Sequence, residues 1–248
     1  MRVFKAAVAA VLLVVPSAAF AQPAERTLTP LEVAVACGPP TTMEMPSEPL
    51  RVIGAQDTVK RLIFNTGDLL ILDGGTAKGV QLNQQFIVRR PMIQGVNRKT
   101  ASGIQTLGWT RIVATNENTA IAKVDHLCDG IFGGDYLEPF VAPEIPLGIE
   151  RDNPAGELDF TALGHVLSGV ENMMSGGLGS LMLIDKGADQ SMAQGARFAV
   201  YRDLHQNGIP LASIAEGVVL SVGKTMSLTK ITRSRDAIVS GDYVVPRK

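Results

Sequence analysis

Two pairs of aspartates are, by residue type, the best candidates in this chain for acid–base chemistry. Asp73 and Asp185 form one pair, Asp135 and Asp242 the other, and all four stand in glycine-rich turns. Paired carboxylates can act as a general acid and a general base. An aspartate in a turn, however, commonly binds its own backbone. Each pair also arises from one motif used twice, and an active site rarely needs to be made twice. The sequence therefore favours structural roles for these residues and predicts that the protein is not an enzyme.

The three histidines do not complete a catalytic or metal-binding set. His126, His165 and His205 lie at unrelated positions, and the sequence contains no motif of a serine hydrolase, a zinc protease or a phosphate-binding loop. A hydrolase is the less favoured alternative, and in that case Asp125 and His126 would be the place to look for catalysis. We expect no metal and no other cofactor, because isolated cysteines and scattered histidines lack the close ligand pairs of zinc sites.

The chain has two cysteines, Cys37 and Cys128. An oxidising compartment favours a disulfide between them, which would attach the N-terminal arm to the first of two sequence repeats. The alternative is two buried thiols that never meet.

A second group of residues is suited to binding rather than to catalysis. The candidates are basic or aromatic and lie beside segments whose lengths differ between the repeats: Arg89, Arg90, Trp109, Tyr201 and Arg202. The neighbouring segments, 91–108 and 203–215, are expected to be loops, and loops on a rigid scaffold often carry specificity. Trp109 could offer a stacking surface to a sugar, although packing in the core is the alternative role.

The elements that position these residues belong to a duplicated unit. Residues 67–90 match 179–202 at a constant offset, and residues 109–139 match 216–246 at an offset five residues shorter. Each copy reads as about five short strands separated by glycine and polar turns, a pattern typical of a small barrel. We therefore predict an all-β fold of two tandem barrel-like repeats with a short helical linker segment.

The chain divides into five expected parts. They are a signal peptide (1–21), an N-terminal arm (22–66), the first β-repeat (67–140), a linker (141–178) and the second β-repeat (179–248). Within the arm, residues 31–37 fit either a strand or a short helix. Within the linker, the apolar residues of 159–174 recur at helical spacing and predict a helix that packs on its own domain.

The N-terminus predicts export. Residues 1–21 combine two basic residues, a short apolar run and an Ala-Phe-Ala cleavage site, which is the pattern of a cleaved secretory signal rather than of a membrane span. Removal of Arg2 and Lys5 leaves 21 basic against 24 acidic residues. This balance argues against nucleic acid as a partner. We expect the mature chain to start at Gln22, to lie in the periplasm or outside the cell, and to have no transmembrane segment.

The repeat unit resembles the small β-modules of bacterial envelope proteins, such as the C-terminal domain of flagellar assembly protein T and modules that follow LysM domains. The residues that carry the resemblance are Asp73, Gly75, Gln85, Phe86, Val88, Arg90, Ile131, Gly134 and Asp135 in the first copy, and Asp185, Gly187, Arg197, Phe198, Val200, Arg202, Ile238, Gly241, Asp242 and Val244 in the second. The resemblance implies a non-enzymatic envelope protein that acts as a scaffold or binding module for another envelope protein. Binding of peptidoglycan or another carbohydrate is the alternative, although the chain contains no LysM segment.

Overall fold

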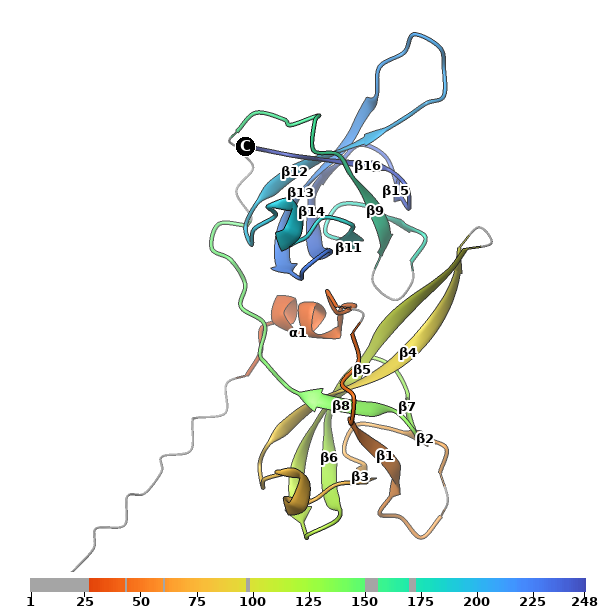
Figure 1. Cartoon of the computed structure of the whole chain (residues 1–248), viewed down its shortest axis with the longest axis vertical. Coiled ribbons are helices and arrows are strands. Elements are labelled where there is room, and N and C mark those ends of the chain that lie inside the picture. Colours follow the sequence, from red (N-terminus) through yellow and green to blue (C-terminus); the bar gives the residue numbers. More distant parts are fainter. Residues whose placement is uncertain (1–26, 43, 60, 97–98, 150–155, 170–172) are drawn as a thin grey trace, which may run out of the picture.

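The computed structural model describes residues 27–42, 44–59, 61–96, 99–149, 156–169 and 173–248. The expected signal peptide lies outside this part of the chain. Two barrels lie one above the other, and a short helix lies between them (Figure 1). The predicted all-β fold of two tandem barrels is confirmed. In the part of the chain that the structure describes, no helix combines the length and apolar character needed to cross a membrane.

Barrel 1 is a closed sheet of six strands in the order β1-β3-β6-β5-β4-β8, and all neighbours are antiparallel. A separate two-stranded sheet, β2–β7, accompanies it. The elements are β1 (Leu50–Ala55), β2 (Ile63–Phe64), β3 (Leu69–Leu72), the 3-10 turn η1 (Thr76–Lys78), β4 (Gln85–Val96), β5 (Lys99–Thr115), β6 (Ala120–Leu127), β7 (Ile131–Phe132) and β8 (Tyr136–Pro139).

Barrel 2 repeats this topology strand for strand. Its closed order, β9-β11-β14-β13-β12-β16, matches that of barrel 1, and β10–β15 corresponds to β2–β7. The elements are β9 (Gly164–Gly169), β10 (Ser175–Gly176), β11 (Leu181–Ile184), the 3-10 turn η3 (Ala188–Gln190), β12 (Arg197–Arg202), β13 (Ala212–Val222), β14 (Ser227–Ser234), β15 (Ile238–Val239) and β16 (Tyr243–Pro246).

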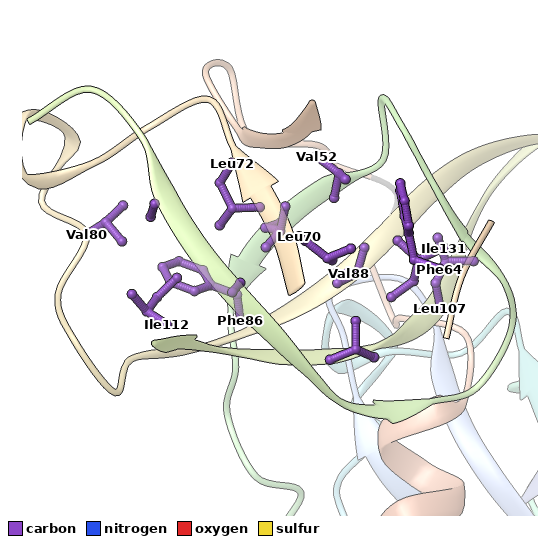
Figure 2. Packing of buried hydrophobic residues seen from close by; sticks show 14 residues of the cluster. Val52, Phe64, Leu70, Leu72, Val80, Phe86, Val88, Leu107, Ile112 and Ile131 are labelled. Carbon is purple, nitrogen blue, oxygen red and sulfur yellow. The ribbon is translucent and has the colours of Figure 1, made fainter. Parts of the chain in front are cut away.

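Each barrel is filled by the alternate side chains of its strands. In barrel 1, Leu70, Leu72, Phe86 and Val88 point into the interior (Figure 2) and are almost completely buried. The equivalent positions of barrel 2 are Met182, Ile184, Phe198 and Val200. The strand period of two places one side chain in every pair inside the barrel. A closed barrel also leaves no free sheet edge.

Glycine is required where the turn η1 crosses the β5–β6 turn. A Cβ atom on Gly75 would lie 2.0 Å from the carbonyl oxygen of Asn116. The same carbonyl accepts a hydrogen bond from the Thr76 backbone at 2.8 Å, so the two chain segments are held in close contact. Gly187 occupies the same place in barrel 2, where an added Cβ atom would lie 2.5 Å from the Lys224 carbonyl oxygen. This contact explains why the glycine occurs in both repeats.

We expect Gly75→Ala to lower the free energy of unfolding by about 2–3 kcal/mol, because the added methyl group must displace backbone rather than a flexible side chain. Gly54→Ala is the matched control, since no atom lies within 4 Å of its Cβ position. That variant should leave stability unchanged or raise it by up to about 1 kcal/mol. Urea unfolding followed by circular dichroism measures both. Equal effects of the two substitutions would contradict the steric explanation.

An arginine–aspartate pair links one strand of each barrel to the turn that precedes the last strand. Arg90 donates from Nε and Nη2 to the two carboxylate oxygens of Asp135, at 2.8 and 2.7 Å. Asp135 also accepts a hydrogen bond from the Phe132 backbone at 2.7 Å. In barrel 2, Arg202 and Asp242 form the same bidentate pair, at 2.8 and 2.7 Å. The structure therefore supports the predicted structural role of Asp135 and Asp242.

Two predictions about local structure are wrong. Part of the segment expected to be a helix, 159–174, forms strand β9, which pairs with β11 on one side and β16 on the other. Pairing on both sides outweighs the apparent helical spacing, and Val166 faces the core of barrel 2. Residues 91–96 and 99–108, expected to be a loop, extend the β4–β5 hairpin instead. The segment 203–211 does lie outside the strands, and β13 begins at Ala212.

The barrels also begin earlier in the chain than the sequence repeats indicate. Strand β1 lies in the region assigned to the N-terminal arm, and β9 lies in the region assigned to the linker. Each forms one wall of its barrel. The duplicated unit therefore extends over about 50–139 and 164–246, with only residues 140–163 between the two barrels.

Candidate functional site

A groove lies where the two barrels, the linker and the N-terminal helix meet. Its volume is about 520 Å³, within the range of ligand sites. The residues that line it come from four parts of the chain: Val35, Ala36 and 38–42 near the helix; Ile87, Arg89, Thr106 and Glu138 on barrel 1; 141–144 in the linker; and Gln194, 220–222 and Leu228 on barrel 2. We refer to this site as the groove.

Helix α1 (Pro30–Cys37) forms one wall of the groove, between the two barrels (Figure 1). Thr29 caps its N-terminus in a capping box with Glu32, and Pro30 occupies the first turn, where its missing N–H is not needed. Val35 packs against Leu220 and Leu228 on the outer face of barrel 2. The sequence allowed a strand or a helix here, and the structure has the helix.

The end of α1 is attached to barrel 1. A disulfide joins Cys37 to Cys128, with 5.4 Å between the Cα atoms. Next to it, the Thr106 hydroxyl donates a hydrogen bond of 2.9 Å to the carbonyl oxygen of Gly38. Helix α1 therefore has a covalent link to barrel 1 and an apolar contact with barrel 2. This arrangement fixes the two sides of the groove relative to each other.

The barrel 1 wall carries a charged pair that barrel 2 lacks. The Nε atom of Arg89 lies 3.3 Å from a carboxylate oxygen of Glu138, and both side chains are largely buried. At the repeat offsets, these two residues correspond to Tyr201 and Val245. The ion pair therefore has no counterpart in barrel 2.

Tyr136 lies beside this pair, opposite Arg89 on the neighbouring strand, and is fully buried. Burial, together with the negative charge of Glu138, raises the pKa of Tyr136 to about 12, while Arg89 acts in the opposite direction. The phenol is therefore neutral at physiological pH.

The titration of Tyr136 gives a prediction for alkaline pH. Since the pKa of a tyrosine in an unfolded chain is about 10, the stability that Tyr136 contributes is complete below pH 10. It should be lost as the pH rises from about 10 to 12. Phenolate absorbance should show one of the three tyrosines ionising last, and Tyr136→Phe should remove that component. Ionisation of all three together near pH 10 would contradict this.

The side-chain amide of Gln194 connects the barrel 2 wall of the groove to the linker. The Nε2 atom of Gln194 donates hydrogen bonds to the carbonyl oxygens of Glu144, at 2.6 Å, and Leu220, at 2.9 Å. The linker also begins on barrel 1, where the Phe140 backbone donates a hydrogen bond of 3.0 Å to the Gln85 carbonyl oxygen. The linker segment that lines the groove is therefore bonded to both barrels.

Of the binding candidates derived from the sequence, only Arg89 lines the groove. Arg90 and Arg202 instead form ion pairs with Asp135 and Asp242 of their own barrels. Tyr201 lies on barrel 2 with its ring against Phe160, at a centroid distance of 5.2 Å. The five candidates thus do not form one site.

Trp109 is 7% exposed. Its ring stacks on His126 at 4.3 Å and lies 5.3 Å from Phe140. A platform for a sugar ring needs a free aromatic face, and both of these neighbours lie against the indole. The core-packing role is therefore the one that the structure supports.

Several residues of the groove were not identified from the sequence: Val35, Thr106, Glu138, Gln194 and Ser221. One signal was present for part of this set, because Arg89 and Glu138 are charged where the second copy has Tyr201 and Val245. Within a duplicated fold, a charged pair found in one copy indicates a role other than building the barrel. No comparable signal in the sequence pointed to the groove residues of α1.

The chemistry of the groove suits binding. Its lining combines apolar side chains with the Arg89–Glu138 ion pair, a second glutamate, hydroxyls and an amide, and the described lining residues include no histidine, cysteine or aromatic ring. A nucleophile with an adjacent base, which covalent catalysis needs, does not occur among them. Comparisons of the chain with protein-family models and with curated proteins give no match.

Proposed function

We propose that this chain is an exported, non-catalytic protein of the bacterial envelope that binds an extended segment of a partner protein in the groove. The observation that carries the proposal is the construction of the groove itself. Four separate parts of the chain build it, and a disulfide and buried apolar contacts hold its two sides together. A preformed site loses less entropy on binding than one that must assemble around its ligand.

The composition of the groove supports a polypeptide as the ligand. Val141 lines the groove and is exposed, so it can contact aliphatic side chains, while the Ser221 hydroxyl can bind backbone groups. The charged residues of the lining are Arg89, which pairs with Glu138, and a second glutamate, Glu144. This excess of negative charge disfavours a phosphate or another polyanion as the ligand.

The second candidate is a peptidoglycan or other carbohydrate ligand, which is the alternative that the sequence left open. Sugar sites usually present aromatic rings, and the described lining residues of the groove have none. Sedimentation of the purified mature chain with isolated peptidoglycan sacculi, with and without added salt, separates the two candidates. Recovery in the supernatant supports a protein partner, whereas salt-resistant sedimentation supports the sugar.

The direct test is photo-crosslinking in cells from Val141, which lines the groove and is 83% exposed. A photoreactive residue at this position should give a single adduct that mass spectrometry identifies as an envelope protein. The same residue placed at Leu82, which is exposed outside the groove lining, should not. Identical adducts from both positions would contradict binding in the groove.

A groove-filling variant gives the quantitative prediction. Ala142→Trp should reduce formation of the Val141 adduct by about tenfold or more, because the indole occupies the space that the ligand needs and tenfold corresponds to only about 1.4 kcal/mol. Ala162→Trp is the control, since Ala162 is half-buried but outside the groove lining. Circular dichroism and thermal unfolding confirm that both variants fold. Equal adduct yields from the two variants would overturn the proposal.

A further inference from the structure

One cluster of possible metal ligands lies outside the groove lining. The two sulfur atoms of Cys37 and Cys128 and a ring nitrogen of His126 all lie within 4.8 Å of one another. Cys37 ends α1, whereas His126 is in β6 and Cys128 follows it. We call these three residues the Cys–His cluster. The sequence predicted no metal site, because Cys37 is separated from Cys128 by 91 residues.

Thiolate sulfur and imidazole nitrogen are the ligands that zinc prefers. Bond lengths of about 2.3 Å to sulfur and 2.0–2.1 Å to nitrogen place the ligand atoms of a tetrahedral site about 3.5–3.8 Å apart. The ligand atoms of the Cys–His cluster all lie within 4.8 Å of one another. In the disulfide, however, the sulfurs are bonded to each other and cannot act as thiolates. Metal binding therefore requires the reduced protein.

The cluster should stay assembled after the disulfide is broken, because other contacts hold its backbone. The Cys128 backbone donates a hydrogen bond of 2.9 Å to the Leu107 carbonyl oxygen. Beside Cys37, the Gly38 carbonyl oxygen accepts a hydrogen bond from Thr106. The ring of His126 is oriented by its stacking on Trp109, with 17° between the planes.

We propose that the reduced form of this protein binds one zinc ion through Cys37, Cys128 and His126, with solvent as the fourth ligand. A dithiol reductant supplies the first step: it forms its own disulfide, and its two electrons and two protons convert the Cys37–Cys128 bond into two thiols. Zinc then replaces the two thiol protons, which pass to solvent. The neutral imidazole donates its nitrogen lone pair.

The consequence concerns the link between α1 and barrel 1. In the oxidised protein this link is the disulfide, and in the reduced, zinc-bound protein it is the metal. Zinc should therefore restore the attachment of α1 that reduction removes. Reduced protein without metal would be the only form in which α1 is held to barrel 1 by noncovalent contacts alone.

Equilibrium dialysis against Zn²⁺ tests the proposal on the full mature chain, with and without a non-thiol reductant. The reduced chain should bind one equivalent and the oxidised chain should bind none at this site. Trp109 is the only tryptophan of the chain and touches His126. Its fluorescence should therefore change when zinc binds to the reduced protein. Equal zinc binding by the reduced and oxidised chains would overturn the proposal.

Variants assign the ligands. His126→Ala should weaken zinc binding by about tenfold or more, since loss of a second-sphere partner of a metal ligand already costs about 10–100-fold. His165→Ala is the matched control, because His165 lies in barrel 2 and pairs with Asp185. Should His126→Ala fail to fold, cobalt substitution in the reduced wild-type chain gives an independent reading. A thiolate-to-cobalt charge-transfer band supports the site, and unchanged affinity in His126→Ala or absence of that band overturns it.

Discussion

Replacing both Cys37 and Cys128 with serine is expected to lower the free energy of unfolding of barrel 1 by about 4–5 kcal/mol. The disulfide closes a loop of 91 residues that contains most of barrel 1, and the entropy of an open loop of this size corresponds to that magnitude. The core of barrel 2 lies outside the loop. It should lose only the support of α1 on its outer face.

Hydrogen exchange measured by mass spectrometry separates these two effects. Peptides from β3 and β6 should exchange much faster in the double variant, whereas peptides from β11 and β14 should change less. Reduced wild-type protein without metal should behave like the variant. Thr106→Val provides a control, because it removes the hydrogen bond to Gly38 but leaves the disulfide intact. Its expected cost is about 1 kcal/mol. Equal acceleration in both barrels would contradict the loop argument.

Asp135→Asn is expected to destabilise barrel 1 by about 3 kcal/mol, and Asp242→Asn should destabilise barrel 2 by a smaller amount. Both aspartates are 4% exposed and form bidentate pairs with arginine. Removing the charge of Asp135 leaves the partly buried guanidinium of Arg90 without this counterion, which is the costly way to break such a pair. Arg202 keeps a second ion pair, with Asp236 at 3.1 Å. The hydrogen bond to Asp242 raises the pKa of Arg202, and a guanidinium stays charged even without that carboxylate.

The control for the aspartate variants is Arg61→Gln. Arg61 forms ion pairs with Asp57 and Asp68 at the surface, with its side chain 47% exposed. Such pairs contribute about 0–1 kcal/mol. Urea unfolding of the three variants should therefore separate them clearly. If Asp135→Asn lowers the free energy of unfolding no more than Arg61→Gln does, the arginine–aspartate pair contributes no more than a surface ion pair to the stability of the barrel.

The sequence was sufficient to predict the barrels because the duplication repeats many core positions and turns. Phe86 and Phe198, or Gly75 and Gly187, each report a structural need that occurs twice. The first strand of each barrel was missed, because β1 and β9 are short and share few residues. Their identity as strands depends on partners that lie far along the chain.

The groove was less predictable than the fold, for a physical reason. Its lining comes from segments as distant as Val35 and Leu228, which meet only because α1 packs between the barrels. A helix of eight residues can occupy many positions, and its sequence does not show which surface covers its apolar side. The pairing of Arg90 with Asp135 was hidden in the same way, although both residues were recognised as parts of the repeat.

The position of α1 has a consequence for the order in which the molecule assembles. In chain order, α1, all strands of barrel 1 and both cysteines precede every residue of barrel 2. The disulfide can therefore form while barrel 2 is still incomplete, with α1 already fixed to a finished barrel. The apolar side of α1 is then already in place when barrel 2 folds, and Leu181, Leu220 and Leu228 can pack against it. Barrel 2 would thus fold in contact with a first barrel that is already complete.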